Sequence, residues 1–147
     1  ARNIFQAFRS DAGEELILDK NIFVERILAG DGRLSEEDLK VYMEPFKSAG
    51  EDRRPTLTWP REIPIAGEPK EIVQLVQSYS DFFSVCDIPK LFINAEPGSI
   101  LVGKQREKTR TWHNQKEVTV EGGHFIQEIS PDDIGGHLAN FIASLTD

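Results

Sequence analysis

The stretch IPKLFINAEPGS, residues 88–99, contains a short apolar run at residues 91–93 that ends at Asn94 and is followed by a turn at Pro97 and Gly98. An apolar run of this length, closed by turn-forming residues, is typical of a buried strand that opens into a loop. A second strand is predicted at EVTV, residues 117–120. Amphipathic segments precede, separate and follow these strands, and the helix–strand–helix–strand–helix order predicts a parallel α/β arrangement.

The first half of the chain is predicted to be helical. Apolar residues recur at helical spacing in residues 4–8 and 22–28, and Ser35 with Asp38 forms a capping signal for a further helix. The proline-containing segment 50–69 is predicted to be an extended surface crossing with at most one short helical turn. We therefore expect a helical region over residues 1–69 and an α/β region over residues 70–147. Two strands are too few for an independent sheet, so the second region is expected to be the final piece of a larger one.

Composition excludes several classes of protein. The 147 residues carry a net charge of −8, which argues against nucleic acid and anionic membrane surfaces as partners. No apolar run approaches the roughly 20 residues of a membrane span, and the first residues show no signal-peptide pattern. Cys86 is the only cysteine, and no set of side chains has the spacing of metal ligands. We expect a cytoplasmic protein without a metal or other cofactor.

One histidine stands out as a candidate for chemistry. The segment VEGGHFIQEISPDD, residues 120–133, places His124 on a loop after the second strand, at the strand end where open α/β sheets assemble their sites. Imidazole is a natural general base near neutral pH, although placement alone leaves a structural role equally open. Glu96 could orient this histidine or could be a solvated carboxylate. His113 and His137 are expected to be solvent-facing or structural. The chain contains no nucleophile elbow.

Several segments together resemble one family. They are NIFQAFRS, AGEEL, NIFVERIL, EPF, GEDRRPTLTWPREIPIAGEP, PKLFINAEPG and GGHFIQEISPDDIG. In this order they resemble the C-terminal half of haloalkane dehalogenases, which have the α/β-hydrolase fold. The segments around EPFK and WPREIP also resemble the coelenterazine luciferase of sea-pansy type. The resemblance implies that residues 1–69 form most of a helical cap and that residues 70–147 form the C-terminal part of the core, with its last two strands.

The resemblance also implies an activity. In haloalkane dehalogenases an aspartate displaces halide from carbon and forms an ester, which a histidine then hydrolyses by activating water. His124 matches that histidine. The nucleophilic aspartate, a halide-holding tryptophan and asparagine, and the acid partner of the histidine match nothing here and belong to the N-terminal half. The expected partners are a small halogenated alkane, halide, water and that N-terminal half. This chain alone is expected to be inactive, and Glu96 is expected only to shape the pocket mouth.

The same resemblance assigns apolar and small residues to the substrate pocket. The residues assigned are Phe5, Phe23, Ile27, Trp59, Pro60 and Ile63 in the cap, and Ser99 and Ile100 after the first strand. Plain core packing is an equally good explanation for Phe5 and Ile27. Two features depart from the family: the short loop AGDGR at residues 29–33, and Ile129 where relatives usually have an aspartate. A coelenterazine monooxygenase and a non-catalytic binding module remain as alternative hypotheses.

Overall fold

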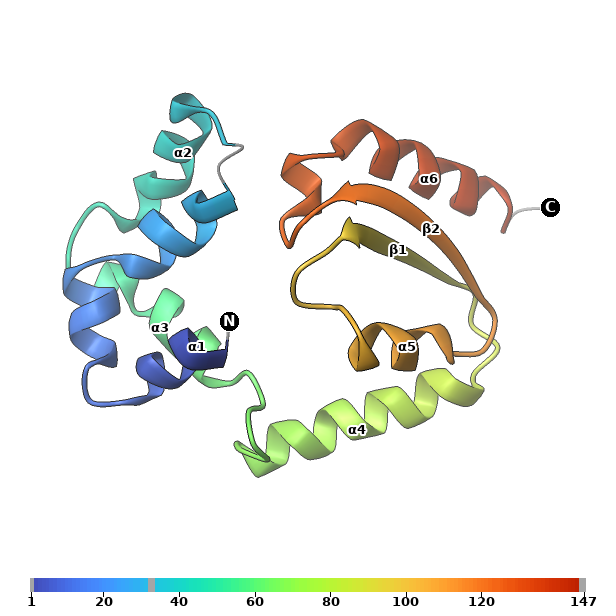
Figure 1. Ribbon diagram of the computed structural model, residues 1–147, viewed down its shortest axis with the longest axis horizontal. Helices are drawn as coiled ribbons and strands as arrows, with labels where there is room; N and C mark the ends of the chain where they lie inside the picture. Colours follow the sequence, from blue (N-terminus) through green and yellow to red (C-terminus); the bar gives the residue numbers. More distant parts are fainter. Residues whose placement is uncertain (1, 32–33, 146–147) are drawn as a thin grey trace. The chain divides into compact units, whose positions relative to one another are not determined.

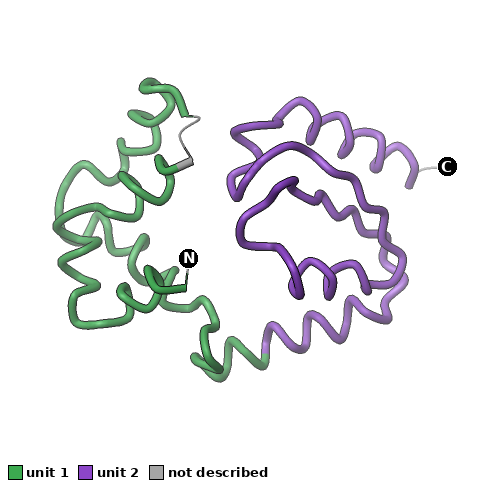
Figure 2. Tube along the Cα trace, viewed as in Figure 1, with its two compact units in different colours: residues 1–74 green, residues 75–147 purple. Residues whose placement is uncertain are grey.

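The computed structural model describes residues 2–31 and 34–145, and the chain divides into two compact units, Ala1–Gln74 and Leu75–Asp147. Figure 2 shows the two units in different colours. Gly32 and Arg33, which belong to the short loop noted in the sequence, lie outside the described residues. Within the described part of the chain, no helix has both the length and the apolar character needed to cross a membrane.

The first unit is helical, as the sequence predicts. It contains α1 (Arg2–Arg9), α2 (Glu36–Met43) and α3 (Pro55–Arg61), and α4 begins at Lys70. The segments Glu15–Asp19 and Phe23–Leu28 are π-helical, and Ala29–Asp31, Glu44–Phe46 and Glu51–Arg53 are 3₁₀ turns. Their apolar faces meet in one core, formed by Phe5, Phe8, Ile17, Leu18 and Leu57. The Phe5 and Phe8 rings pack edge to face, with their centroids 6.1 Å apart.

The capping signal at Ser35 is confirmed. The Ser35 hydroxyl accepts a hydrogen bond from the backbone N–H of Asp38 at 3.1 Å, and α2 begins at the next residue, Glu36. Three acidic residues occupy the first turn of this helix. Negative charge in the first turn stabilises a helix because it interacts favourably with the positive end of the helix dipole.

The prediction for residues 50–69 is wrong. The segment folds into the 3₁₀ turn Glu51–Arg53 followed directly by the seven-residue helix α3, with Pro60 inside it. Pro55 occupies the first turn, where a proline is tolerated because that N–H has no helical acceptor. Leu57 and Pro60 are fully buried. Burial of these side chains in the core outweighs the local signal of the prolines.

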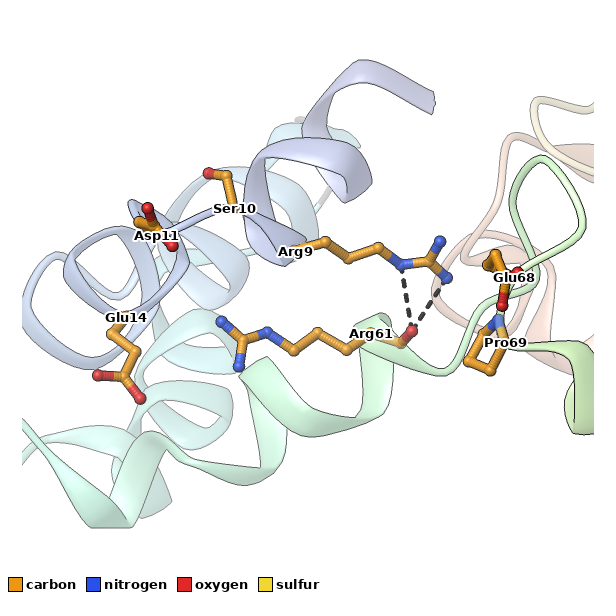
Figure 3. Close-up of a pocket in the computed structure, with 7 residues that line it drawn as sticks. All are labelled: Arg9, Ser10, Asp11, Glu14, Arg61, Glu68 and Pro69. Carbon is orange, nitrogen blue, oxygen red and sulfur yellow. Dashed lines mark hydrogen bonds between the residues drawn. The ribbon is translucent and has the colours of Figure 1, made fainter.

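Arginine side chains connect distant segments of the first unit through backbone carbonyls. Arg9 donates from Nε and Nη2 to the carbonyl of Arg61, at 3.2 and 2.9 Å, and also to that of Ile63. Arg61 in turn donates from Nε to the carbonyl of Phe8 at 2.8 Å. Figure 3 shows both arginines among the residues that line an open pocket of about 640 Å³, together with Asp11, Glu14 and Glu68. These reciprocal bonds hold α1 against the end of α3.

The second unit has the predicted helix–strand–helix–strand–helix order. It contains the rest of α4 (Lys70–Val85), then β1 (Lys90–Pro97), α5 (Lys104–Arg110), β2 (Gln115–Gly122) and α6 (Pro131–Ala143). The strands are parallel, with Lys90 opposite Gln115 and Pro97 opposite Gly122. Figure 1 shows α6 on one side of the strand pair, with α4 and α5 on the other. Both strands therefore end at the same edge, and the loops that follow them emerge together.

Candidate active site

The loops that follow β1 and β2 line one cavity. This cavity has a volume of about 210 Å³ and lies at the carboxyl ends of the two strands. Its lining residues are Ile93, Ala95, Gly98, Ser99, Ile100, Leu101, Gly123, His124 and Ile126. Three residues singled out in the sequence, Ser99, Ile100 and His124, are thus brought together. The remaining walls are mainly aliphatic, which suits an apolar ligand.

The β1 side of the cavity follows from strand geometry. Ile93 and Ala95 line the cavity, whereas the alternate residues Phe92 and Asn94 are buried. At the end of the strand, Gly98 has a φ of +73°, and a Cβ there would lie 2.6 Å from Nη2 of Arg106 and 2.9 Å from the carbonyl oxygen of Ala95. Only glycine fits this turn, which carries Ser99 and Ile100 to the cavity.

The β2 side contains the histidine loop, defined here as residues 122–129. The N–H of Gly98 donates to the carbonyl of Gly122 at 2.9 Å, so the two loops are joined through their backbones. A Cβ at Gly122 would lie 2.9 Å from Cγ2 of Ile126, because the loop folds back on itself through the 3₁₀ turn Ile126–Glu128. The pair of glycines noted in the sequence therefore begins a compact loop.

The loop leaves the His124 side chain exposed. Its ring contacts Phe125 at a centroid distance of 4.8 Å, and within residues 2–31 and 34–145 it has no hydrogen-bonding or ion-pair partner. The exposed imidazole therefore lines the cavity with neither ring nitrogen engaged by the described residues. A carboxylate that orients the ring is not found among the described residues.

Glu96 does not supply that carboxylate. Its Oε2 atom pairs with Nη1 of Arg106 at 3.3 Å. Arg106 is itself held beneath the loop, since its Nη2 donates to the carbonyl oxygens of Ala95 and Pro97 at 2.8 and 3.2 Å. Glu96 thus belongs to a structural network that shapes the turn after β1.

The other two histidines lie elsewhere. His113 is exposed, and its Nε2 atom lies 3.0 Å from Oδ1 of Asp87. His137 is half-buried within α6. Among the residues that the structure describes, no group of three or more histidine, cysteine or carboxylate side chains could hold a metal ion.

The candidate residues of the first unit gather around its core. Phe5 and Pro60 are buried, and Phe23, Ile27 and Ile63 pack half-buried against the core cluster. Trp59 is different, because 60% of its surface is exposed. Its ring packs edge to face with that of Phe23, with the ring centroids 5.9 Å apart. An exposed indole next to an apolar ring is the feature of this unit most suited to contact a ligand.

Several residues of the site were not identified from the sequence. Ile93, Ala95, Leu101 and Ile126 line the cavity beside His124. The alternation of side chains along the first predicted strand is a signal that could have selected Ile93 and Ala95. Leu101 and Ile126 lie in irregular loops, for which local sequence has no comparable rule.

Ser130 closes the base of the histidine loop with its side chain. It occupies the N-cap position of α6, but its side chain makes no capping hydrogen bond. Its hydroxyl donates instead to the carbonyl oxygen of Glu121 at 2.9 Å, across the base of the histidine loop.

Comparison with known sequences shows that the chain is similar to haloalkane dehalogenases. The haloalkane dehalogenase of Sphingobium indicum is 56% identical over 146 residues, which cover 98% of this chain and 49% of that protein. The coelenterazine h 2-monooxygenase of Renilla reniformis is 39% identical over 138 residues, covering 91% of this chain and 44% of that protein. No protein-family model matches the chain. The chain spans about half the length of these relatives.

Comparison with solved structures shows the same similarity to haloalkane dehalogenases. Haloalkane dehalogenase DbeA from Bradyrhizobium elkani has a TM-score of 0.90 and 39% sequence identity, with 99% of this chain and 51% of that chain covered. An ancestral haloalkane dehalogenase has a TM-score of 0.90 and 38% identity, with 99% and 52% covered. The predicted fold class, the C-terminal part of an α/β-hydrolase fold, is confirmed. The predicted relationship to haloalkane dehalogenases is confirmed as well.

Proposed function

We propose that this chain, which is related along its whole length to haloalkane dehalogenases, supplies the cap and the hydrolytic histidine of such an enzyme. One observation carries the proposal: His124, Ser99 and Ile100 line one small, largely aliphatic cavity at the carboxyl ends of two parallel strands. Ligand sites of open α/β sheets lie at this edge. The chain spans about half the length of these relatives, and we assign the nucleophile to the half of such an enzyme that this chain does not cover.

The proposed reaction has two steps. An aspartate carboxylate attacks the carbon that bears the halogen, the carbon–halogen bond breaks, and halide leaves with the bonding electrons. The alkyl group is then an ester on the enzyme. His124 takes a proton from water, and the resulting hydroxide attacks the ester carbonyl. The tetrahedral intermediate expels the alkoxide, which departs as the alcohol after taking that proton back from His124, and the carboxylic acid loses its proton to solvent, which regenerates the carboxylate. A positioned base of this kind typically contributes about 10²–10⁴-fold to the rate of such a step.

The surroundings of His124 fit its proposed role as the base of ester hydrolysis. Its imidazole is exposed and pairs with no carboxylate in the described part of the chain, so the proposed acid partner comes from the N-terminal half. Ile100 and Ser99 form the adjacent wall of the cavity. An aliphatic wall favours displacement, because removing water strengthens the electrostatic interactions of the nucleophile.

The helical region has a separate proposed role. We assign residues 1–69 to the cap and residues 70–147 to the core, close to the division between the two compact units. Within the cap, the proposed pocket residues are Phe5, Phe23, Ile27, Trp59, Pro60 and Ile63. Trp59 is expected to contribute most, because its ring is largely exposed, whereas Phe5 and Pro60 are already buried in the unit itself. We also propose that the enzyme acts in the cytoplasm, without a cofactor.

The test uses a complete enzyme, assembled by joining the N-terminal half of the Sphingobium indicum dehalogenase to residues 1–147. In this chimera, His124→Ala should still release one halide per site from 1-bromobutane and should then stop. Mass spectrometry should show the alkyl ester on the nucleophile. His113→Ala, which removes an exposed histidine away from the cavity, is the matched control and should turn over normally. Sustained turnover by the His124→Ala variant contradicts the proposal.

The same chimera separates the alternatives. Halide release without light emission from coelenterazine supports a dehalogenase, whereas light without halide release supports a monooxygenase. A protein that folds cooperatively and does neither supports a non-catalytic module. Residues 1–147 expressed alone should release no halide, since the proposed nucleophile is absent.

A further inference from the structure

We propose that Ser130 is a positioning residue for His124, acting through a hydroxyl clamp that closes the base of the histidine loop. This inference rests on the proposed function of His124 as the base of ester hydrolysis. The clamp is the hydrogen bond from Oγ of Ser130 to the carbonyl oxygen of Glu121, with a length of 2.9 Å. Ser130 follows the loop and Glu121 precedes it, so one bond joins the two ends of residues 122–129.

Ser130 makes three hydrogen bonds that meet at this junction. Its N–H donates to the carbonyl of Ile126 inside the loop at 2.8 Å, and its own carbonyl accepts from the N–H of Ile134 in α6 at 3.0 Å. With the clamp to Glu121, the residue connects the end of β2, the turn of the loop and the first turn of α6. Ser130 is 7% exposed, so these bonds are largely shielded from water.

Strand geometry explains why the clamp falls on Glu121. The carbonyl of Gly122 points toward β1, since it accepts from the N–H of Gly98. Successive carbonyls along a strand point to opposite edges, so the carbonyl of Glu121 points away from β1, toward the side on which the Ser130 hydroxyl donates to it. Both sides of the β2 terminus are thereby held immediately before His124.

The imidazole itself has little to hold it. Its ring contact is with Phe125, the next residue of the same loop, and the described residues provide no hydrogen bond to either ring nitrogen. The backbone of the histidine loop therefore determines the position of the proposed base. A displacement of about 1 Å in a catalytic group can cost about 10²-fold in rate. Loosening the clamp should slow the step that uses His124 and leave the displacement of halide unchanged.

The experiment compares Ser130→Ala with Ser144→Ala in the complete chimeric enzyme. Ser144, at the other end of α6, also donates from its hydroxyl to a carbonyl, that of Phe141, but is exposed and remote from the loop. Rapid-quench measurements with 1-bromobutane give the burst of halide and the subsequent steady rate. The burst amplitude counts folded, competent sites, so the hydrolysis rate is expressed per competent site.

For Ser130→Ala we expect an unchanged burst rate, a hydrolysis rate about 10-fold to 100-fold lower, and accumulation of the alkyl ester. Ser144→Ala should match the parent enzyme in both steps. A hydrolysis rate for Ser130→Ala within about twofold of the parent overturns the inference, as does an equal slowing of both steps. If the alanine variant gives no burst, the test uses Ser130→Thr, which keeps the hydroxyl. A hydrolysis rate near that of the parent enzyme supports the clamp, and a rate about 10-fold or more below the parent contradicts it.

The outcome for His124→Ala keeps the two proposals apart. If that variant turns over normally, the function proposed for His124 fails, whatever Ser130 does. If His124→Ala stops at the ester while Ser130→Ala hydrolyses it normally, the proposed function stands and only the positioning role fails.

Discussion

Replacing Arg53 with methionine should strongly destabilise the helical unit. The Arg53 guanidinium is buried, with 8% of the residue exposed, and donates to four backbone carbonyls. The carbonyls belong to Phe46, Leu18, Asp19 and Lys47, at distances of 2.8, 3.0, 2.8 and 3.1 Å. These bonds connect the π-helical segment Glu15–Asp19 with the 3₁₀ turn Glu44–Phe46 and the residue that follows it. Methionine has a similar length and donates to none of them.

The expected cost follows from those four bonds. A hydrogen bond to a charged group contributes about 1.5–3 kcal/mol net, and such bonds are not additive. Because water can reach some of the released carbonyls, we expect a total loss of about 3–5 kcal/mol, the usual range when one partner of a buried charged network is removed. Lysine at this position keeps the positive charge but lacks the planar guanidinium group with its several N–H donors, so Arg53→Lys should lose less stability than Arg53→Met but should remain less stable than the parent.

Thermal unfolding of the chimeric enzyme measures this effect. The chimera has about 300 residues, since 146 residues cover 49% of the relative, and at about 2.1 cal/mol/K of unfolding entropy per residue its Tm changes by roughly 1.6 °C per kcal/mol. Arg53→Met should therefore lower Tm by about 5–8 °C for a loss of about 3–5 kcal/mol. Arg54→Met is the matched control, since among the described residues the side chain of this neighbouring arginine pairs with the exposed carboxylates of Glu14 and Glu51. It should change Tm very little. Equal Tm values for the two variants refute the assignment of Arg53 as a structural arginine.

Three further outcomes are expected in the same enzyme. Trp59→Ala should weaken halide and substrate binding while Tm stays nearly constant, and an unchanged KM together with unchanged quenching of fluorescence by halide shows that Trp59 only packs. Gly122→Ala should slow ester hydrolysis more than halide release, because the Cβ of the alanine would lie 2.9 Å from Cγ2 of Ile126. Hydrolysis and halide release at the rates of the parent enzyme count against a tight loop. The hydrogen bond from Arg110 lowers the pKa of Glu117 below its usual 4.5. That carboxylate therefore stabilises the fold above this pH and ceases to do so as pH falls through the lowered pKa, so the Tm difference between the parent and Glu117→Gln should shrink between about pH 7 and about pH 3.

Local sequence was sufficient to predict the structure wherever the residues that interact are close together in the chain. The helix at residues 36–43 begins where the Ser35 signal predicts, because the cap and the N–H that it satisfies are three residues apart. The order of helices and strands follows from apolar periodicity, which reports on a single element at a time. The position of His124 on a loop after the second strand was read in the same way. The identity of the fold came from the resemblance of whole segments, since two strands alone do not distinguish one α/β fold from another.

Tertiary structure decided what depends on contacts between distant residues. The prolines of segment 50–69 favour an extended chain locally, yet α3 forms because burial of Leu57 beside Phe8 stabilises it. The Ser130 hydroxyl could cap α6 or reach Glu121, nine residues earlier, and only the path of the loop selects the second partner. Glu96 could face His124 or Arg106, and the turn at Gly98 brings Arg106 to it. In each case local sequence allows two or more choices, and the choice is made by a partner that only the folded chain brings within reach.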